Sequence, residues 1–285
     1  MTCRIIPRLD IKGPNLVKGI HLEGLRILGK PEAFAKHYYE QGADELIYMD
    51  IVASLYERNS LAELISTTAQ KIFIPLTVGG GLRSIKDIET VLGAGADKVA
   101  INTAAIRNPD FIKEAAEKYG SSTIIVSIEA IKKSNGSYEA FTDNGREETG
   151  LDVFEWAKQA AALGAGEILI TSVDREGTGF GFDLPLVKKM SESVSIPVIA
   201  LGGGGSVEHI HEVITKGKAD AVSIASLLHY DFIRNHDMLK ADYSDEGNID
   251  YLKSGKPFSN IQPLSMKEIK RFLINTDVAC RPVEV

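Results

Sequence analysis

The sequence predicts an α/β protein of the (β/α)8 barrel class, the TIM barrel, built from two duplicated half-barrels. Short apolar runs alternate with amphipathic stretches along the chain, a pattern typical of parallel strands covered by helices. One sequence pattern occurs twice, with the copies about 120 residues apart. The 285 residues, of which 44% are hydrophobic, suffice for the core of one such barrel.

The two copies of the repeated pattern match position by position. Residues 74–103 correspond to residues 196–226, so that Gly80-Gly81 matches Gly202-Gly203, 122 positions later. Upstream, residues 43–50 match 165–172 with the same spacing of 122, and residues 4–10 match 123–129 with a spacing of 119. This period is too long for a solenoid repeat and fits a duplicated half-barrel. A doubly wound open sheet is the alternative, but a repeat of four βα units favours a closed barrel.

The individual elements follow from composition and from their boundary residues. Most of the eight expected strands are rich in Val, Ile and Leu, as buried parallel strands are. The segment 31–42 has Pro31 in its first turn and Gly42 at its end, which are typical helix start and stop signals. Further helices are expected at 84–95, 108–120, 151–164 and 266–274. The strands are expected near residues 4–9, 45–50, 74–78, 97–101, 123–129, 167–171, 197–201 and 220–224.

The chain is expected to form a single domain over residues 1–285. The two half-barrels would span about 1–120 and 121–285. An insertion at about 229–265 follows the eighth strand and precedes the last helix. Because this insertion leaves the carboxyl end of a strand, we expect it over the catalytic face, either as a lid or as a surface loop.

Composition argues against several classes of function. The net charge is −7 and no block of Lys and Arg stands out, so general affinity for nucleic acid is not expected. No apolar run reaches the roughly 18 residues of a membrane span, and no signal peptide is visible. Two cysteines, Cys3 and Cys280, do not make a disulfide framework, which predicts a cytoplasmic protein. No metal site or cofactor is predicted, since His209 and His211 would diverge on a helix.

The repeated glycines predict two phosphate sites. In a barrel, the loops after the seventh and eighth strands often hold a phosphate by backbone N–H groups, and glycine permits the close approach. Tight turns alone would also explain one glycine run, but two copies at matched positions favour phosphate binding. The candidate residues are Gly80, Gly81, Asn102 and Thr103 in the first half and Gly202, Gly203, Ala225 and Ser226 in the second.

Two carboxylates end equivalent strands. Asp10 ends the first expected strand and Glu129 ends the fifth, and these strands lie across the barrel from each other. The two side chains would therefore face each other over the mouth, placed for general acid and general base catalysis. Capping of the following helices is the alternative. Lys18, in the loop after the first strand, could bind an anion or favour ionisation of Asp10.

Four charged residues lie at or near the opposite ends of the strands: Arg4, Glu45, Lys98 and Glu167. Inward charges at the bottom of a barrel are costly unless they are paired. Two residues of each sign could form a neutral ring of salt bridges. From the residues alone, a structural plug or separate surface pairs is the favoured interpretation.

These features together resemble one family, the cyclase subunit (HisF) of imidazole glycerol phosphate synthase in histidine biosynthesis. The resemblance spans about residues 1–230 and the last helix. The sister isomerase family shares the repeat, but DKVAINTAA and GEILITSVDREGT are similar to the cyclase. The motifs are LDIKGPNLVKG (9–19), DELIYMDIVAS (44–54), TVGGGLRS (77–84), ADKVAINTAA (96–105), GAGEILITSVDREGT (164–178) and GGGG (202–205).

The resemblance implies a reaction and a partner. A HisH-type glutaminase subunit would dock on the N-terminal face of the barrel, and its ammonia would pass through the barrel to the C-terminal face. There it would attack a bis-phosphorylated phosphoribulosyl-formimino aminoimidazole carboxamide ribotide, giving imidazole glycerol phosphate and the aminoimidazole carboxamide ribotide. Asp10 matches the first of two family carboxylates, and Arg4, Glu45, Lys98 and Glu167 match its charged ammonia gate. Matching pocket positions are Lys18, Asp50, Gly81, Asn102, Thr103, Thr171, Asp174, Gly177, Gly203 and Ser226.

The sequence departs from the family pattern at four pocket positions. Glu129 and Glu176 stand where the family has aspartate, and Leu201 stands where it has serine. Arg8 replaces a typical cysteine, and its side chain should point into the barrel like that of Asp10. A guanidinium there needs an acceptor, for which Glu129 is the candidate.

These departures leave two alternatives to the histidine-pathway cyclase. One is a paralogue that uses glutaminase-derived ammonia to amidinate a nucleotide sugar or glycan precursor. The other is a catalytically silent barrel that regulates a glutaminase.

Overall fold

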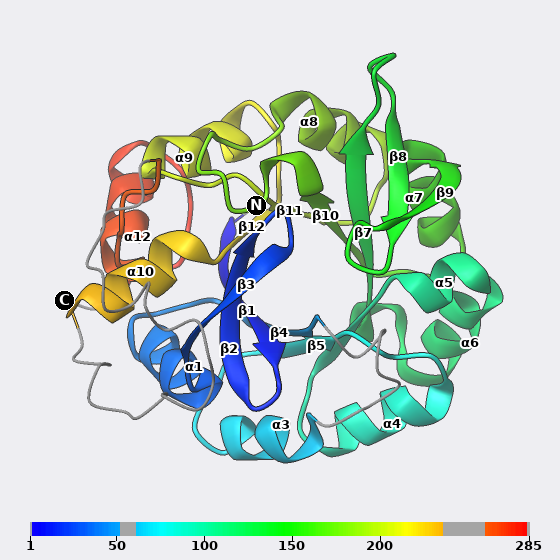
Figure 1. Ribbon diagram of the computed structural model, residues 1–285, viewed down its shortest axis with the longest axis horizontal. Helices are drawn as coiled ribbons and strands as arrows, with labels where there is room; N and C mark the ends of the chain where they lie inside the picture. Colours follow the sequence, from blue (N-terminus) through cyan, green and yellow to red (C-terminus); the bar gives the residue numbers. More distant parts are fainter. Residues whose placement is uncertain (1, 52–60, 236–259, 284–285) are drawn as a thin grey trace.

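Eight parallel strands close into a barrel in the computed structural model, which describes residues 2–51, 61–235 and 260–283. The strand order is β10-β11-β12-β1-β4-β5-β6-β7, and β7 pairs with β10 to complete the ring. Helices surround the strands on the outside (Figure 1). The predicted fold class is therefore confirmed. The barrel strands are β1 (Arg4–Lys12), β4 (Leu46–Asp50), β5 (Leu76–Gly79), β6 (Lys98–Ile101), β7 (Ile124–Lys132), β10 (Glu167–Ser172), β11 (Val198–Leu201) and β12 (Ala221–Ile224).

Several of the described helices begin with a side-chain cap, and the helices bury apolar residues against the strands. Ser84 and Asp87 form a capping box at the start of α4, and Ser265 and Glu268 form another at the start of α12. None of the helices within the described residues is long and apolar enough to span a membrane. The helices are α1 (Pro31–Glu40), α3 (Ala62–Ala69), α4 (Ile85–Gly93), α5 (Thr103–Arg107), α6 (Asp110–Tyr119), α7 (Val153–Ala162), α8 (Leu184–Ser193), α9 (Val207–Thr215), α10 (Ser226–Asn235) and α12 (Met266–Asn275), with short 3-10 turns η1 (Ser121–Thr123) and η2 (Val173–Arg175).

Alternation along the strands separates two apolar clusters. In β1, Ile5, Leu9 and Ile11 belong to the large cluster between the strands and the helices, whereas Ile6 belongs to a smaller cluster inside the barrel. Because successive side chains of a strand point to opposite faces, Arg4, Arg8 and Asp10 share the inward face with Ile6. The small cluster contains Ile6, Val17, Ile47, Met49, Ile51, Ala100, Ile125, Leu169, Ile199, Leu201 and Ala221.

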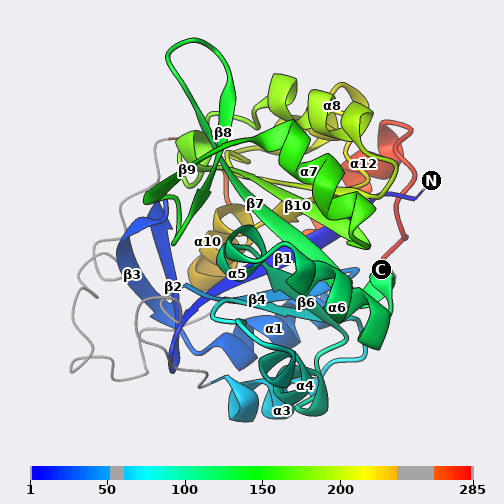
Figure 2. The same ribbon diagram turned by 90° about the vertical axis from the view of Figure 1, so that its right-hand side faces the viewer.

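Two barrel strands continue into antiparallel extensions that were not expected from the sequence. β1 pairs with β2 (Asn15–Ile20), which pairs with β3 (Glu23–Gly29). β7 pairs with β8 (Tyr138–Thr142), which pairs with β9 (Glu147–Asp152). Figure 2 shows both extensions at one end of the barrel, away from the end where the chain termini are drawn. They follow corresponding strands of the two halves, so the duplication extends to them.

The predicted insertion is wrong over its first residues, because α10 covers residues 226–235. Leu227, Leu228 and Phe232 are buried there, and Phe232 packs on Phe34 of α1 with ring centroids 4.4 Å apart. Burial of this face explains why the segment is helical despite its polar residues. Residues 236–259, the larger part of the predicted insertion, lie outside the described residues.

Candidate active site

Asp10 and Glu129 lie on the inward faces of strands opposite each other in the barrel. Asp10 follows Ile6 and Arg8 in the inward alternation of β1, and Glu129 follows the interior residue Ile125 in β7. Four strand positions separate β1 from β7 around the ring of eight. Both strands run on past these carboxylates into the antiparallel extensions, so neither residue ends its strand as predicted.

Asp10 is buried and paired with a cation of its own strand. The Arg8 Nε donates a hydrogen bond to Asp10 Oδ1 at 2.7 Å, and the two residues are only 4% and 3% exposed. The sequence-based expectation that Glu129 accepts from Arg8 is therefore wrong. Alternate residues of one strand lie on the same side and close together, which makes Asp10 the nearer acceptor.

The environment of Glu129 favours its protonated form. Burial raises the pKa of Glu129 to about 7, and the charges of Asp143 and Asp10 act in the same direction. Two contacts oppose this shift: a hydrogen bond of 2.8 Å donated by the Gly145 N–H to Oε2, and the positive charge of Arg8. A carboxyl group with a pKa near neutrality can both give and take a proton at physiological pH.

Lys18 of β2 is buried and forms an ion pair with Glu176, which is also buried. Although burial opposes the charge, Glu176 and then Asp10 raise the pKa of Lys18. Lys18 therefore adds a positive charge close to Asp10, as the sequence indicated. The pairing with Glu176 was not predicted.

The first glycine exit lies on a cavity of about 260 Å³. The cavity reaches Glu129, and two arginines, Arg83 and Arg107, contribute to its wall. Backbone groups, an amide, a hydroxyl and cations thus surround one space, which suits an anion such as phosphate. The sequence-predicted residues that line it are Asp50, Gly80, Gly81, Asn102, Thr103 and Glu129.

Packing also requires these glycines. Gly80 has a φ of 94°, and a Cβ there would collide with the carbonyl oxygen of Asp50 at the end of β4. Gly202, with a φ of 98°, would place a Cβ 2.6 Å from the carbonyl oxygen of Ser172 at the end of β10. The two contacts are repeat equivalents, so the glycines allow the strand exits to approach whether or not a phosphate binds.

The second glycine exit is packed beneath a neighbouring loop. The Gly181 N–H donates to the Gly203 carbonyl oxygen at 2.8 Å, and a Cβ at Gly203 would collide with the Gly181 carbonyl oxygen. Ala225 and Ser226 are buried where β12 passes into α10.

The remaining predicted pocket residues have three different surroundings. Thr171 is fully buried on the inward face of β10, and its hydroxyl has no hydrogen-bond partner among the residues that the structure describes. Gly177, in the loop after η2, packs against Gly19 of β2. This contact brings the loop to the β2–β3 extension. Asp174 is exposed, accepts a hydrogen bond of 2.8 Å from the Lys132 N–H, and lines a separate cavity with Arg175. The structure does not bring Asp174 to the cavity at Gly80 and Gly81.

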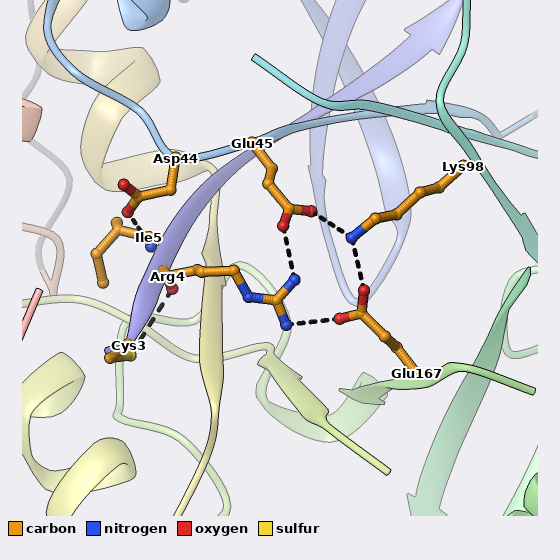
Figure 3. Close-up of polar contacts among 7 residues, drawn as sticks. All are labelled: Cys3, Arg4, Ile5, Asp44, Glu45, Lys98 and Glu167. Carbon is orange, nitrogen blue, oxygen red and sulfur yellow. Dashed lines mark hydrogen bonds and ion pairs between the residues drawn. The ribbon is translucent and has the colours of Figure 1, made fainter. Parts of the chain in front are cut away.

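The four charged residues at the opposite end form a closed ring (Figure 3). Arg4 donates to Glu45 and to Glu167, at 2.6 Å each. Lys98 contacts the same two carboxylates at 3.1 and 2.6 Å. Although burial opposes the shift, hydrogen bonds and charges of Arg4 and Lys98 lower the pKa of Glu167. The structure therefore shows the ring of salt bridges, one of the arrangements that the sequence left open.

A turn that was not expected from the sequence supports the site. Asp143, Asn144 and Gly145 connect β8 to β9, and this turn lines the cavity and binds Glu129 through Gly145. Asn144 also donates to the Ile51 carbonyl oxygen. Asn-Gly is a strong hairpin signal, so Asn144-Gly145 could have located the turn although β9 is not apolar.

Comparison with known proteins finds a matching family and similar relatives. Residues 4–234 match the family described as "Histidine biosynthesis protein". The imidazole glycerol phosphate synthase subunit HisF of Legionella pneumophila is 61% identical over 208 residues. The match covers 73% of this chain and 98% of that relative.

Proposed function

We propose that this chain, which belongs to the histidine biosynthesis protein family, is the cyclase subunit of imidazole glycerol phosphate synthase, a lyase. Its substrate would be ammonia together with the bis-phosphorylated phosphoribulosyl-formimino aminoimidazole carboxamide ribotide. Its products would be imidazole glycerol phosphate and the aminoimidazole carboxamide ribotide. The observation that carries the proposal is the 61% identity, which extends over 98% of a HisF subunit.

The two carboxylates supply the proton transfers. Condensation of ammonia with a carbonyl carbon requires a base that takes a proton from the attacking nitrogen and an acid that protonates the carbonyl oxygen, which leaves as water. Asp10, which accepts a hydrogen bond from Arg8 and lies near the charge of Lys18, acts as the base. Glu129, whose pKa is about 7, acts as the acid.

The two glycine exits bind the two phosphates of the substrate. The cavity at Gly80, Gly81 and Thr103 accepts one phosphate, and the exit at Gly203 and Ser226 accepts the other. Repeat-related exits suit a substrate with a phosphate at each end, because corresponding strands present the same backbone groups. This arrangement stretches the substrate across the mouth, over Asp10 and Glu129.

The opposite face receives the glutaminase. The charged ring lies at this end of the barrel, where it can admit ammonia. Phe73, just before β5, is 80% exposed there, and a cavity of about 340 Å³ lies beside it, lined also by Pro75 and Asp97. An exposed aromatic side chain next to a cavity is a typical anchor of a protein interface. Cytoplasmic location stays a prediction from the sequence.

The test is turnover of the purified chain with ammonium chloride and the bis-phosphorylated ribotide. We expect imidazole glycerol phosphate to form, and Asp10→Asn to lower kcat by on the order of 10²–10⁴-fold. Asp110→Asn, an exposed carboxylate in the first turn of α6, is the matched control and should leave kcat unchanged.

The same assay separates the alternatives. Absence of product, with stimulation of a glutaminase, would favour the regulatory barrel. Absence of product with this ribotide, but amidination of a nucleotide sugar, would favour the paralogue. Unchanged kcat in Asp10→Asn would exclude the carboxylate mechanism.

A further inference from the structure

Arg8 occupies the barrel interior directly beneath the Asp10 carboxylate. Its Nε contacts Asp10 Oδ1 at 2.7 Å, and both side chains are almost completely buried. The pair is two residues apart on one strand, so the sheet fixes the spacing of the two side chains. Contact with Arg8 engages one carboxylate oxygen and leaves Oδ2 outside this hydrogen bond.

The same guanidinium balances three carboxylates from three parts of the chain. Although burial opposes the charge, Asp10, then Glu176 and Glu129, raise the pKa of Arg8. Glu176 already has its own cation, because Lys18 forms an ion pair with it. Arg8 is therefore the cation that Asp10 and Glu129 share.

We propose that Arg8 is a positioning residue that orients the Asp10 carboxylate and sets the charge balance of the Asp10–Glu129 pair. This role rests on the proposed function. An arginine keeps its charge when buried, and its planar donors fix the direction of a carboxylate. A neutral side chain of similar size would leave Asp10 free to turn and would remove the positive charge that acts on both carboxylates.

The kinetic test compares Arg8→Gln and Arg8→Lys with the wild type under ammonium chloride. We expect Arg8→Gln to lower kcat by on the order of 10²-fold while KM changes little, because misplaced proton-transfer groups affect the transition state. Arg8→Lys keeps the charge but loses the fixed geometry, so its kcat should lie between those of the wild type and Arg8→Gln. Wild-type kcat in Arg8→Gln would overturn the proposal.

The pH dependence distinguishes this role from simple packing. Arg8 lowers the pKa of Glu129, whereas burial and the charges of Asp143 and Asp10 raise it. Removal of Arg8 should raise this pKa further, and the activity limb that belongs to Glu129 should move to higher pH. Arg8→Lys should keep the limb near its wild-type position. A limb that stays in place in Arg8→Gln would contradict the proposal.

A titration of the Glu129 carboxyl carbon by NMR gives the same readout without substrate. It therefore separates a failure of this inference from a failure of the proposed function. The matched control is Lys270→Gln, since Lys270 is a fully buried cation paired with Asp44 at 2.6 Å, away from the mouth. Lys270→Gln should lower stability without shifting the Glu129 titration. An equal shift in both variants would overturn the proposal.

Discussion

Glu129 links the chemistry of the site to the stability of the fold. Burial raises its pKa to about 7, above the value of 4.5 for a carboxyl group in the unfolded chain. The folded state therefore holds this proton more tightly than the unfolded state. Stability from this residue is fully present below pH 4.5 and is lost as the pH rises through about 7.

This linkage predicts the effect of Glu129→Gln on stability. Glutamine cannot ionise and can still accept the Gly145 hydrogen bond. We expect the variant to be more stable than the wild type by about 1–3 kcal/mol at pH 8 and nearly equal to it at pH 4.5. Urea unfolding at both pH values measures this, and an equal difference at the two values would contradict the pKa argument.

At the scale of single residues, sequence identified the inward carboxylates but not their partners. The alternation of β1 and the repeat were enough to place Asp10 and Glu129 at one mouth. The contact between Lys18 and Glu176 joins residues 158 positions apart, and no local pattern specifies it. The acceptor of Arg8 is Asp10 and not the expected Glu129, because the next inward residue of the same strand is nearer than a residue across the barrel.

The extensions β2–β3 and β8–β9 are the elements that shape the mouth. β2 contributes Lys18, and the turn between β8 and β9 holds Glu129 through Gly145. The eight barrel strands could be predicted from the sequence because continuous apolar runs mark them. β9 did not stand out because it is largely exposed and lacks an apolar run.

The role of the β8–β9 turn can be tested by two matched glycine substitutions. Gly145 and Gly136 both have positive φ, 74° and 85°, so alanine should cost each about 1 kcal/mol or more of stability. A Cβ at Gly145 would also meet Val173 at 3.1 Å, whereas at Gly136 nothing lies within 4 Å. We expect Gly145→Ala alone to lower kcat, because relief of the contact with Val173 would disturb the turn whose Gly145 N–H binds Glu129. Thermal unfolding and ammonium-dependent kinetics check this, and equal kcat values would contradict it.

At the scale of the whole molecule, duplication gives two similar halves with different surroundings. The glycine contacts at Gly80 and Gly202 repeat, and the antiparallel extensions follow corresponding strands. The first glycine exit, at Gly80 and Gly81, lines a cavity, whereas the loop that contains Gly181 packs on the second glycine exit, at Gly203. Sequence predicted the shared framework because the repeat encodes it. The difference arises from contacts between loops, which no repeat specifies.

The two ends of the barrel should separate ammonia supply from chemistry. Phe73 is 80% exposed at the N-terminal end, and Phe180, 63% exposed, lies on the loop that follows β10 at the other end. If a HisH-type glutaminase docks on the N-terminal face, Phe73→Ser should weaken its binding by about tenfold or more, because an aromatic anchor is lost.

The ratio of glutamine-dependent to ammonium-dependent turnover is the readout. It should fall in Phe73→Ser at limiting glutaminase, while ammonium-dependent turnover stays unchanged. Phe180→Ser is the matched control: it removes an exposed phenylalanine from the opposite end and should leave the ratio unaltered. A fall of the ratio in Phe180→Ser alone would contradict docking of the glutaminase on the N-terminal face. It would also contradict the entry of ammonia through the ring of Arg4, Glu45, Lys98 and Glu167.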